Sequence, residues 1–199
     1  LISASIPFAI VFIAIRSSIV NGYGYKNNKV INKKETLLFR DIPCNKDIYY
    51  ANTLTKLNNE IFTGYKETNI FGGIILKWVK ENKVKFINQT KGVFNKETSS
   101  IDLTLNPTFD NVLEKELFDI MYEASGDGIL ETKELEKWNN KHYTKFFNLF
   151  ERINKVEIEK LKQGNHIYTR ANKEECKKKN IMDDTIYEES VKLYGLKKF

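Results

Sequence analysis

The sequence predicts an α+β fold, mainly α, that comes after a membrane-embedded segment. Three observations lead to this prediction. Fifteen uncharged residues open the 199-residue chain. Apolar residues recur at helical spacing over most of the remaining chain, and two short stretches alternate apolar and polar side chains as strands do. Together they indicate a truncated transmembrane helix followed by helical subdomains with a small β-hairpin.

The opening stretch, LISASIPFAIVFIAI, ends at Arg16. At about 1.5 Å per residue it covers roughly 22 Å, less than the ~30 Å hydrocarbon core, so we expect a span whose first turns precede Leu1. Two other interpretations remain open: the core of a signal peptide, although no basic residues precede it, and a buried helix of a soluble domain. The predicted partial transmembrane helix covers residues 1–20, and membrane lipid is its expected partner.

Basic residues come directly after this segment. Residues 16–40 contain six basic side chains and one acid, Glu35. An excess of Lys and Arg beside a span marks the cytoplasmic side, so we place the protein in the cell membrane with residues after about 20 in the cytoplasm. The two cysteines, Cys44 and Cys176, form no pairing or metal pattern, which agrees with a reducing compartment.

The net charge of +6 is concentrated next to the predicted span. Residues 1–110 carry 15 basic and 9 acidic side chains, residues 111–163 carry 9 and 11, and residues 164–199 carry 8 and 6. An anionic leaflet attracts such a segment by roughly 1 kcal/mol per Lys or Arg near its surface. The basic composition is therefore explained without nucleic acid.

A juxtamembrane linker is predicted over residues 21–45. NGYGYKNNK at residues 21–29 is rich in Gly and Asn, and a short extended piece at residues 37–39 is closed by Pro43. A helix is expected over residues 47–58, where apolar side chains recur at spacings of three.

The stretch 68–86 predicts a helix that leads into a strand. Asn69 can cap the helix, and its apolar residues form a broad stripe with Lys77 and Lys80 outside it. Gly72 and Gly73 cost about 1 kcal/mol each in helix propensity, so we expect a neighbour to pack closely on them.

Residues 84–90 and 100–105 alternate as two strands around a polar turn region. Two helices followed by a two-stranded hairpin are typical of a winged helix. We therefore predict a winged-helix-like subdomain over residues 46–106 and a second helical, winged-helix-like subdomain over residues 107–199.

Helices dominate the second subdomain. Asn106 and Pro107 are predicted as the cap and first residue of a helix that ends before Gly126. A further helix from about Glu131 is expected to break at Asn139 and Asn140 and to resume as far as Gly164. Three shorter elements are expected after it: a strand at residues 166–169, a charged surface segment at 171–180, and a final helix at 185–199.

The segment EASGDGILETKE, residues 123–134, has the spacing of a calcium loop, with Gly128 at the sixth place. The ligand places hold Glu123, Ser125, Asp127 and Glu134. Glu at the first place, where Asp is expected, pushes its carboxylate past the ion, and no second loop of this kind is visible. We therefore interpret the segment as a turn between two helices.

No other segment has the pattern of a catalytic or cofactor site. His142 and His166 are isolated from ligand clusters, and the sequence lacks a nucleophile elbow and a phosphate-binding loop. Trp78 and Trp138 are interpreted as core residues. We expect no enzymatic activity, cofactor, metal or small-molecule ligand.

A basic face was considered as a nucleic-acid interface. Four lysines of the helix–strand unit could face phosphates: Lys77, Lys80, Lys83 and Lys85. A DNA reader usually adds Arg or Asn aimed at base edges, and here only Lys is present, with Glu81 among them. A solvated face is the preferred interpretation, and nucleic acid is not the expected partner.

Four segments carry a resemblance: FRDIPCNKDI, IFGGIILKWVKENKVKF, ASGDGILETKELEKW and the terminal YGLKKF. They resemble a bacterial family of predicted multi-pass membrane proteins of unknown function (DUF type). The resemblance implies an extracytoplasmic β domain, a transmembrane helix and a cytoplasmic winged-helix-like region, of which this chain would be a middle piece. Residues 170–180 are more charged and less strand-like than that pattern. The family has no established activity or catalytic residues to transfer.

The sequence thus predicts a non-enzymatic cytoplasmic module of a membrane protein that mediates protein–protein contacts at the membrane. The alternative is a membrane-tethered DNA-binding transcription regulator that uses Lys77 and its neighbours. A third hypothesis is a calcium-responsive element at residues 123–134.

Overall fold

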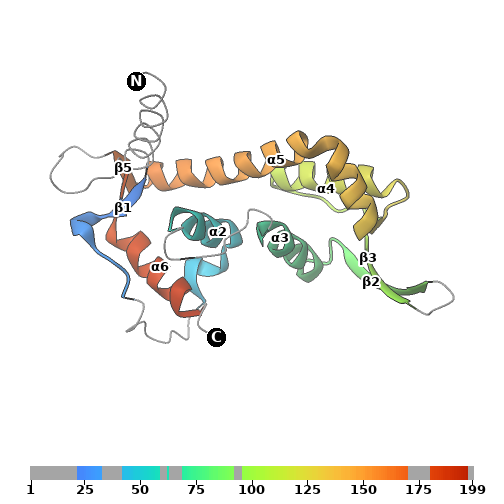
Figure 1. The fold of residues 1–199 in the computed structure, drawn as a ribbon, viewed down its shortest axis with the longest axis horizontal. Helices are drawn as coiled ribbons and strands as arrows, with labels where there is room; N and C mark the ends of the chain where they lie inside the picture. The colour runs from blue at the N-terminus through green and yellow to red at the C-terminus, as the bar shows by residue number, and fades with distance from the viewer. Residues whose placement is uncertain are drawn as a thin grey trace, which may run out of the picture. The chain divides into compact units, whose positions relative to one another are not determined.

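The computed structural model describes residues 22–32, 42–58, 62, 69–91, 96–169 and 180–196. These residues form an α+β fold that is mainly α, as predicted, with two three-stranded sheets. The chain divides into two compact units (Figure 1). Unit 1 combines Leu1–Tyr65 with Glu157–Phe199, and unit 2 is Lys66–Val156.

The predicted transmembrane segment, residues 1–20, lies outside the described residues. In the part of the chain that the structure describes, none of the helices has the length and apolar character needed to cross a membrane.

The two units differ from the predicted subdomains 46–106 and 107–199. Helix α2 (Ile48–Leu57) belongs to unit 1, whereas helix α3 (Asn69–Lys80) belongs to unit 2. The two helices that were predicted to share one subdomain therefore lie in different units. The reason is that α2 buries Leu54 in a cluster supplied by both ends of the chain.

Unit 1 contains a sheet with strand order β1-β6-β5. Strand β1 (Tyr23–Tyr25) is parallel to β6 (Asn180–Met182), and β6 is antiparallel to β5 (Ile167–Thr169). The strand predicted at residues 166–169 is confirmed. Residues 170–179, which hold most of the predicted charged segment, lie outside the described residues.

The prediction that residues 21–45 form a linker is wrong for the part that the structure describes. Besides β1, this stretch contains two 3-10 turns, η1 (Lys26–Asn28) and η2 (Pro43–Lys46). Tyr25, Ile31 and Cys44 are all buried in the core of unit 1. Asn27 and Asn28 have left-handed backbone geometry here, with φ of 57° and 51°, in the turn that follows β1.

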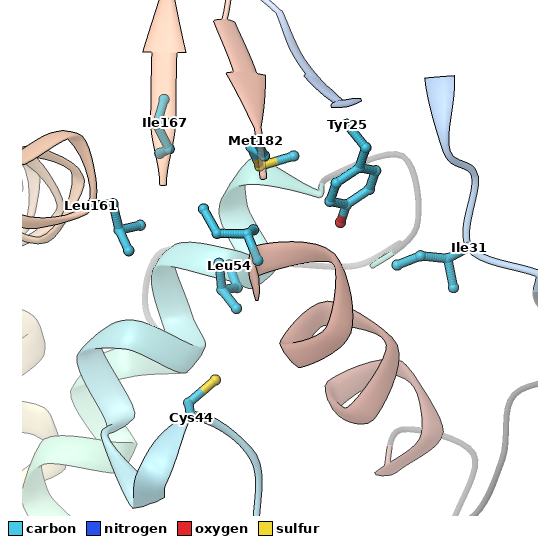
Figure 2. Close-up of a cluster of buried hydrophobic side chains, with 8 residues drawn as sticks. Tyr25, Ile31, Cys44, Leu54, Leu161, Ile167 and Met182 are labelled. Carbon is cyan, nitrogen blue, oxygen red and sulfur yellow. The ribbon is translucent and has the colours of Figure 1, made fainter. Parts of the chain in front are cut away.

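Figure 2 shows this core, in which side chains from both ends of the chain meet. Leu54 of α2 lies among Leu161, Ile167 and Met182, and the Tyr25 ring approaches from β1. Helix α6 (Asp184–Leu196), which confirms the predicted final helix, contacts α2 and adds the fully buried Ile186. The predicted α2 is confirmed as well, with Asp47 as its N-cap accepting hydrogen bonds from Tyr49 N and Tyr50 N.

Unit 2 begins with α3, which leads into a hairpin of β2 (Lys85–Lys91) and β3 (Lys96–Asp102). The predicted hairpin is confirmed, but its second strand begins at Lys96, four residues earlier than predicted, and ends at Asp102. A third short strand, β4 (Ile129–Glu131), pairs antiparallel with β3 and gives the order β2-β3-β4.

Helix α4 (Val112–Ser125) starts later than predicted. Asn111 is its N-cap, and the Asn111 side chain accepts hydrogen bonds from Leu113 N and Glu114 N. Asn106 has φ of 46°, a left-handed conformation, whereas an N-cap residue is extended. Asn106 and Pro107 therefore belong to a turn before the helix. The predicted end is confirmed, because Gly126 is the C-cap with φ of 71°.

Helix α5 (Thr132–Gln163) is continuous except for a kink at His142, where φ is −126° and ψ is 28°. The predicted interruption at Asn139 and Asn140 thus occurs two residues later. The core of unit 2 is aromatic: Trp78 is fully buried and its ring lies 5.1 Å from that of Phe109 and 6.0 Å from that of Phe118. Trp138 is buried too, so both tryptophans are core residues, as predicted.

Candidate functional site

The residues of the calcium-like loop span the end of α4, strand β4 and the start of α5. Three of its polar side chains satisfy the backbone of the loop itself. Ser125 Oγ accepts from Gly128 N at 2.9 Å, Asp127 Oδ1 accepts from Ile129 N at 2.8 Å, and Glu134 Oε2 accepts from Glu131 N at 2.9 Å. These contacts build a turn that connects two helices.

Gly128 is required by this turn. Its φ is 89°, and a Cβ at this position would lie 2.9 Å from Thr104 Cγ2. The glycine at the sixth place of the motif therefore has a structural explanation in the packing of β4 against the segment after β3.

Glu123, at the first ligand place, binds other partners. Its Oε1 accepts from Trp138 Nε1 at 3.2 Å and its Oε2 lies 3.2 Å from Lys145 Nζ. The hydrogen bond from Trp138, followed by that from Lys145, lowers the pKa of the Glu123 carboxyl below its ordinary 4.5. No group of three or more His, Cys, Asp or Glu side chains suited to a metal ion occurs among the described residues.

The proposed nucleic-acid lysines do not form one free surface. Lys77 Nζ lies 2.5 Å from Glu114 Oε1, and Trp78 Nε1 donates to Glu114 Oε2 at 2.7 Å. Glu114 is only 3% exposed, so one buried carboxylate of α4 binds two consecutive side chains of α3. This arrangement fixes α3 against α4 and directs the Lys77 ammonium toward the protein.

Lys83 is engaged as well, because its Nζ lies 2.7 Å from Glu81 Oε2 and 4.8 Å from the centroid of the Phe109 ring. Lys80 and Lys85 are exposed. Two of the four lysines thus remain available for a polyanion.

The outer face of α3 exposes a large apolar side chain that sequence inspection missed. Leu76 is 64% exposed, and Gly72, one turn earlier, is exposed with no heavy atom within 4 Å of its Cβ position. The prediction that a close neighbour explains Gly72 is therefore wrong for the described residues. The signal that could have revealed this face is the position of Leu76 and Gly72, four residues apart on the same side of the helix.

A second missed surface is the outer side of the first part of α5. Lys133, Lys137 and Lys141 are exposed there at successive turns, and this spacing is visible in the sequence.

In unit 1 the titratable groups hold elements together. Burial raises the pKa of the Cys44 thiol to about 12, and Cys44 N donates to Glu189 Oε2 at 2.6 Å. His166 Nδ1 lies 2.8 Å from Asp183 Oδ2, while Asp183 Oδ1 accepts from Ile186 N at the start of α6. The His166–Asp183 pair therefore joins the end of α5 to the start of α6.

The core of unit 1 also contains a polar network. Tyr25 OH donates to Asn58 Oδ1, and Asn58 Nδ2 donates to Ser190 Oγ at 2.9 Å. Burial is the largest influence on the Tyr25 hydroxyl and raises its pKa to about 12. The phenol stays protonated and acts as a fixed donor.

Comparison of the chain with protein-family models, with curated proteins and with solved structures finds no match.

Proposed function

We propose that the chain is a non-enzymatic module, anchored in the membrane by residues 1–20, that binds another protein through the outer face of α3. The observation that carries this proposal is the exposed pair Gly72 and Leu76. Covering one Leu side chain stabilises a contact by roughly 1.5–3 kcal/mol, and a glycine beside it allows the partner's backbone to approach closely.

The glycine supports the proposal for an energetic reason. A glycine inside a helix costs about 1 kcal/mol relative to alanine. In the described residues nothing packs on Gly72, so the described part of unit 2 does not recover this cost. A partner that packs against the glycine would recover it.

We also propose that unit 2 is winged-helix-like with a rotated chain order. In the usual order a helix, a short strand and two helices precede the hairpin. Here α4, β4 and the first part of α5 follow the hairpin, while α3 precedes it, and β4 pairs with β3 as the short strand does in that fold. The family resemblance of the sequence is in keeping with this assignment.

The winged-helix-like topology of unit 2 is the feature that supports the DNA-binding alternative. The lysines of the predicted DNA-binding face oppose this alternative, because Lys77 and Lys83 are bound to acids of unit 2. A protein that binds a duplex by about 6–10 phosphate contacts needs more cations than the predicted face supplies, since only Lys80 and Lys85 of its four lysines are exposed.

A photo-crosslinking amino acid at position 76 of the full chain, expressed in native membranes, tests the protein-contact proposal. We expect a discrete crosslinked protein at position 76 and none at position 112, where Val112 is 78% exposed and serves as the matched control.

The variant Gly72→Leu sharpens this experiment. It should raise the thermal midpoint of unit 2, because open space receives the side chain and helix propensity improves, yet it should abolish the crosslink at position 76. Equal crosslinking at positions 76 and 112 would contradict the proposal. Binding to random duplex with a steep salt dependence would favour the DNA alternative instead.

A further inference from the structure

Three lysines lie on one side of the first part of α5. Lys133, Lys137 and Lys141 recur at every fourth residue, so their Cα atoms are about 6 Å apart along the axis and on the same side of the helix. The kink at His142 follows the last of them, so all three lie on one regular helical stretch.

The other cations of unit 2 provide the contrast. Five of them have acidic partners within it: Lys77, Lys83, Lys115, Lys145 and Arg152. The three lysines of α5 are exposed and form no ion pair with any of the described residues. Their charges are therefore available to an external anion.

A shallow depression of about 340 Å³ lies between these lysines. Lys133, Glu136, Lys137, Asn140 and Lys141 line it. Three lysines face a single glutamate, and the lining contains no apolar or aromatic residue. We call this surface the α5 lysine face.

The composition of the α5 lysine face indicates the class of its partner. Protein interfaces are depleted in Lys and have an apolar centre, which this face lacks. Arg is preferred where a carboxylate or phosphate is held in a fixed, paired geometry, whereas Lys is a flexible point charge that requires no fixed geometry of the anion. The area is too small for the phosphate contacts of a duplex.

We infer that the α5 lysine face contacts the phosphate groups of an anionic membrane surface and thereby orients unit 2 on the bilayer. This inference rests on the membrane anchor of the proposed function. Each lysine contributes roughly fivefold to membrane affinity, which is weak for a free protein but sufficient for a domain that an anchor already holds near the surface.

The test uses the full chain reconstituted with vesicles of phosphatidylcholine alone or with added phosphatidylglycerol. Acylation of each lysine is followed by mass spectrometry. Lys133, Lys137 and Lys141 should react several-fold more slowly on the anionic vesicles, and high salt should restore their reactivity. Lys80 and Lys85, which are exposed elsewhere in unit 2, should react equally on both vesicles and serve as internal controls.

A charge-matched pair of variants gives a second readout. Backbone hydrogen exchange over residues 132–141 should slow on anionic vesicles in the wild type. The triple variant Lys133→Gln, Lys137→Gln, Lys141→Gln should lose this effect, whereas Lys46→Gln, Lys80→Gln, Lys85→Gln should keep it.

Several results would overturn the inference. The first is that the three lysines react equally fast on both kinds of vesicle. The second is that the anionic vesicles slow the acylation of all exposed lysines equally. The third is that inorganic phosphate, polyglutamate or random duplex slows the acylation of the three lysines to the same extent without vesicles. A chain that associates with neither vesicle would remove the proposed anchor together with this inference. A chain that is anchored in both vesicles but shows no lysine protection would remove the inference alone.

Discussion

Unit 1 and unit 2 differ in how far apart along the chain their contacting residues lie. In unit 2, Trp78 and Glu114 are 36 residues apart, as are Glu116 and Arg152. In unit 1, Asn58 and Ser190 are 132 residues apart and Cys44 and Glu189 are 145 apart. A continuous segment thus builds unit 2, whereas unit 1 forms only when both ends of the chain meet.

The cores differ in chemistry as well. Aromatic rings and one buried carboxylate hold unit 2 together, and the buried network of Tyr25, Asn58 and Ser190 joins the distant segments of unit 1. Hydrogen bonds between buried groups require specific partners, so a polar network can select the correct pairing of remote segments. We therefore expect unit 2 to fold autonomously and unit 1 to depend on chain closure.

Expressing segments of the chain separately should have the largest effect on folding. Residues 66–156 alone should unfold cooperatively, because this continuous segment forms one compact unit. Residues 1–65 alone should show no cooperative transition, because they lack the strands β5 and β6 and helix α6. Circular dichroism during thermal unfolding measures both. A folded 1–65 fragment, or an unfolded 66–156 fragment, would contradict the expectation that unit 2 folds autonomously and that unit 1 requires both ends of the chain.

Core truncations should separate the two units in the intact chain. Trp78→Ala should lower the free energy of unfolding of unit 2 by about 3–5 kcal/mol, and Leu54→Ala should lower that of unit 1 by about 2–5 kcal/mol. Both tryptophans, Trp78 and Trp138, belong to unit 2. Tryptophan fluorescence during urea denaturation therefore reports the unfolding of unit 2 alone. We expect Leu54→Ala to leave the midpoint of this transition unchanged.

Removing Asn58, the central residue of the buried polar network, should lower the free energy of unfolding of unit 1 by a smaller amount. Asn58→Ala removes the side-chain amide that accepts from the Tyr25 hydroxyl and donates to Ser190, which costs about 1–3 kcal/mol. Thr55→Ala is the matched control, because its partly buried hydroxyl donates to a carbonyl of the preceding turn. If the two variants lowered the free energy of unfolding equally in chemical denaturation, the buried network would contribute no more than an ordinary side-chain hydrogen bond.

The Cys44 thiol should report on the closure of unit 1. Burial raises its pKa from 9.0 to about 12, so the folded state holds the proton more tightly. The resulting stability is complete below pH 9.0 and declines as the pH rises toward 12. In a Cys176→Ala variant at pH 9, a thiol reagent should react at least about tenfold more slowly than in urea. Rapid reaction in the native state would contradict the closed core.

The smallest effects are expected at the α4–α5 turn. Millimolar calcium should leave the midpoint of unit 2 unchanged, because Trp138 and Lys145 bind the Glu123 carboxylate. The pKa of Glu123 is lowered, so its contribution to stability is present above pH 4.5 and disappears as the pH falls through the folded-state value. Glu123→Gln should flatten this acid dependence. A calcium-induced rise of several degrees would support the third hypothesis.

The sequence predicted local elements well and their partners poorly. The apolar periodicity of residues 68–86 and 112–125 and the alternation of the hairpin are local signals, and the structure contains these elements. Strand β1 has three residues and pairs with β6, more than 150 positions away, so no local pattern could have revealed it. Gly24 in this strand and the asparagines that follow it resemble the residues of a linker.

In the candidate sites, too, the sequence shows the residues and only the fold shows their partners. The lysines at residues 77–85 are evident in the sequence, but only the fold shows that Glu114 binds Lys77 and that Glu81 and Phe109 engage Lys83. The connection between two helices at residues 123–134 was predicted, but strand β4 within it was not, and the partners of Glu123 come from α5. Leu76 was assigned to no face because its exposure depends on what the rest of the unit leaves uncovered.

By itself the sequence determined the helices, the hairpin, the mainly α class and the placement of charge, because these depend on neighbours within a few residues. The tertiary structure alone decided which helices share a core, which lysines stay free, and that the supposed linker supplies a strand. Those outcomes depend on burial and pairing between segments that only meet when the chain folds.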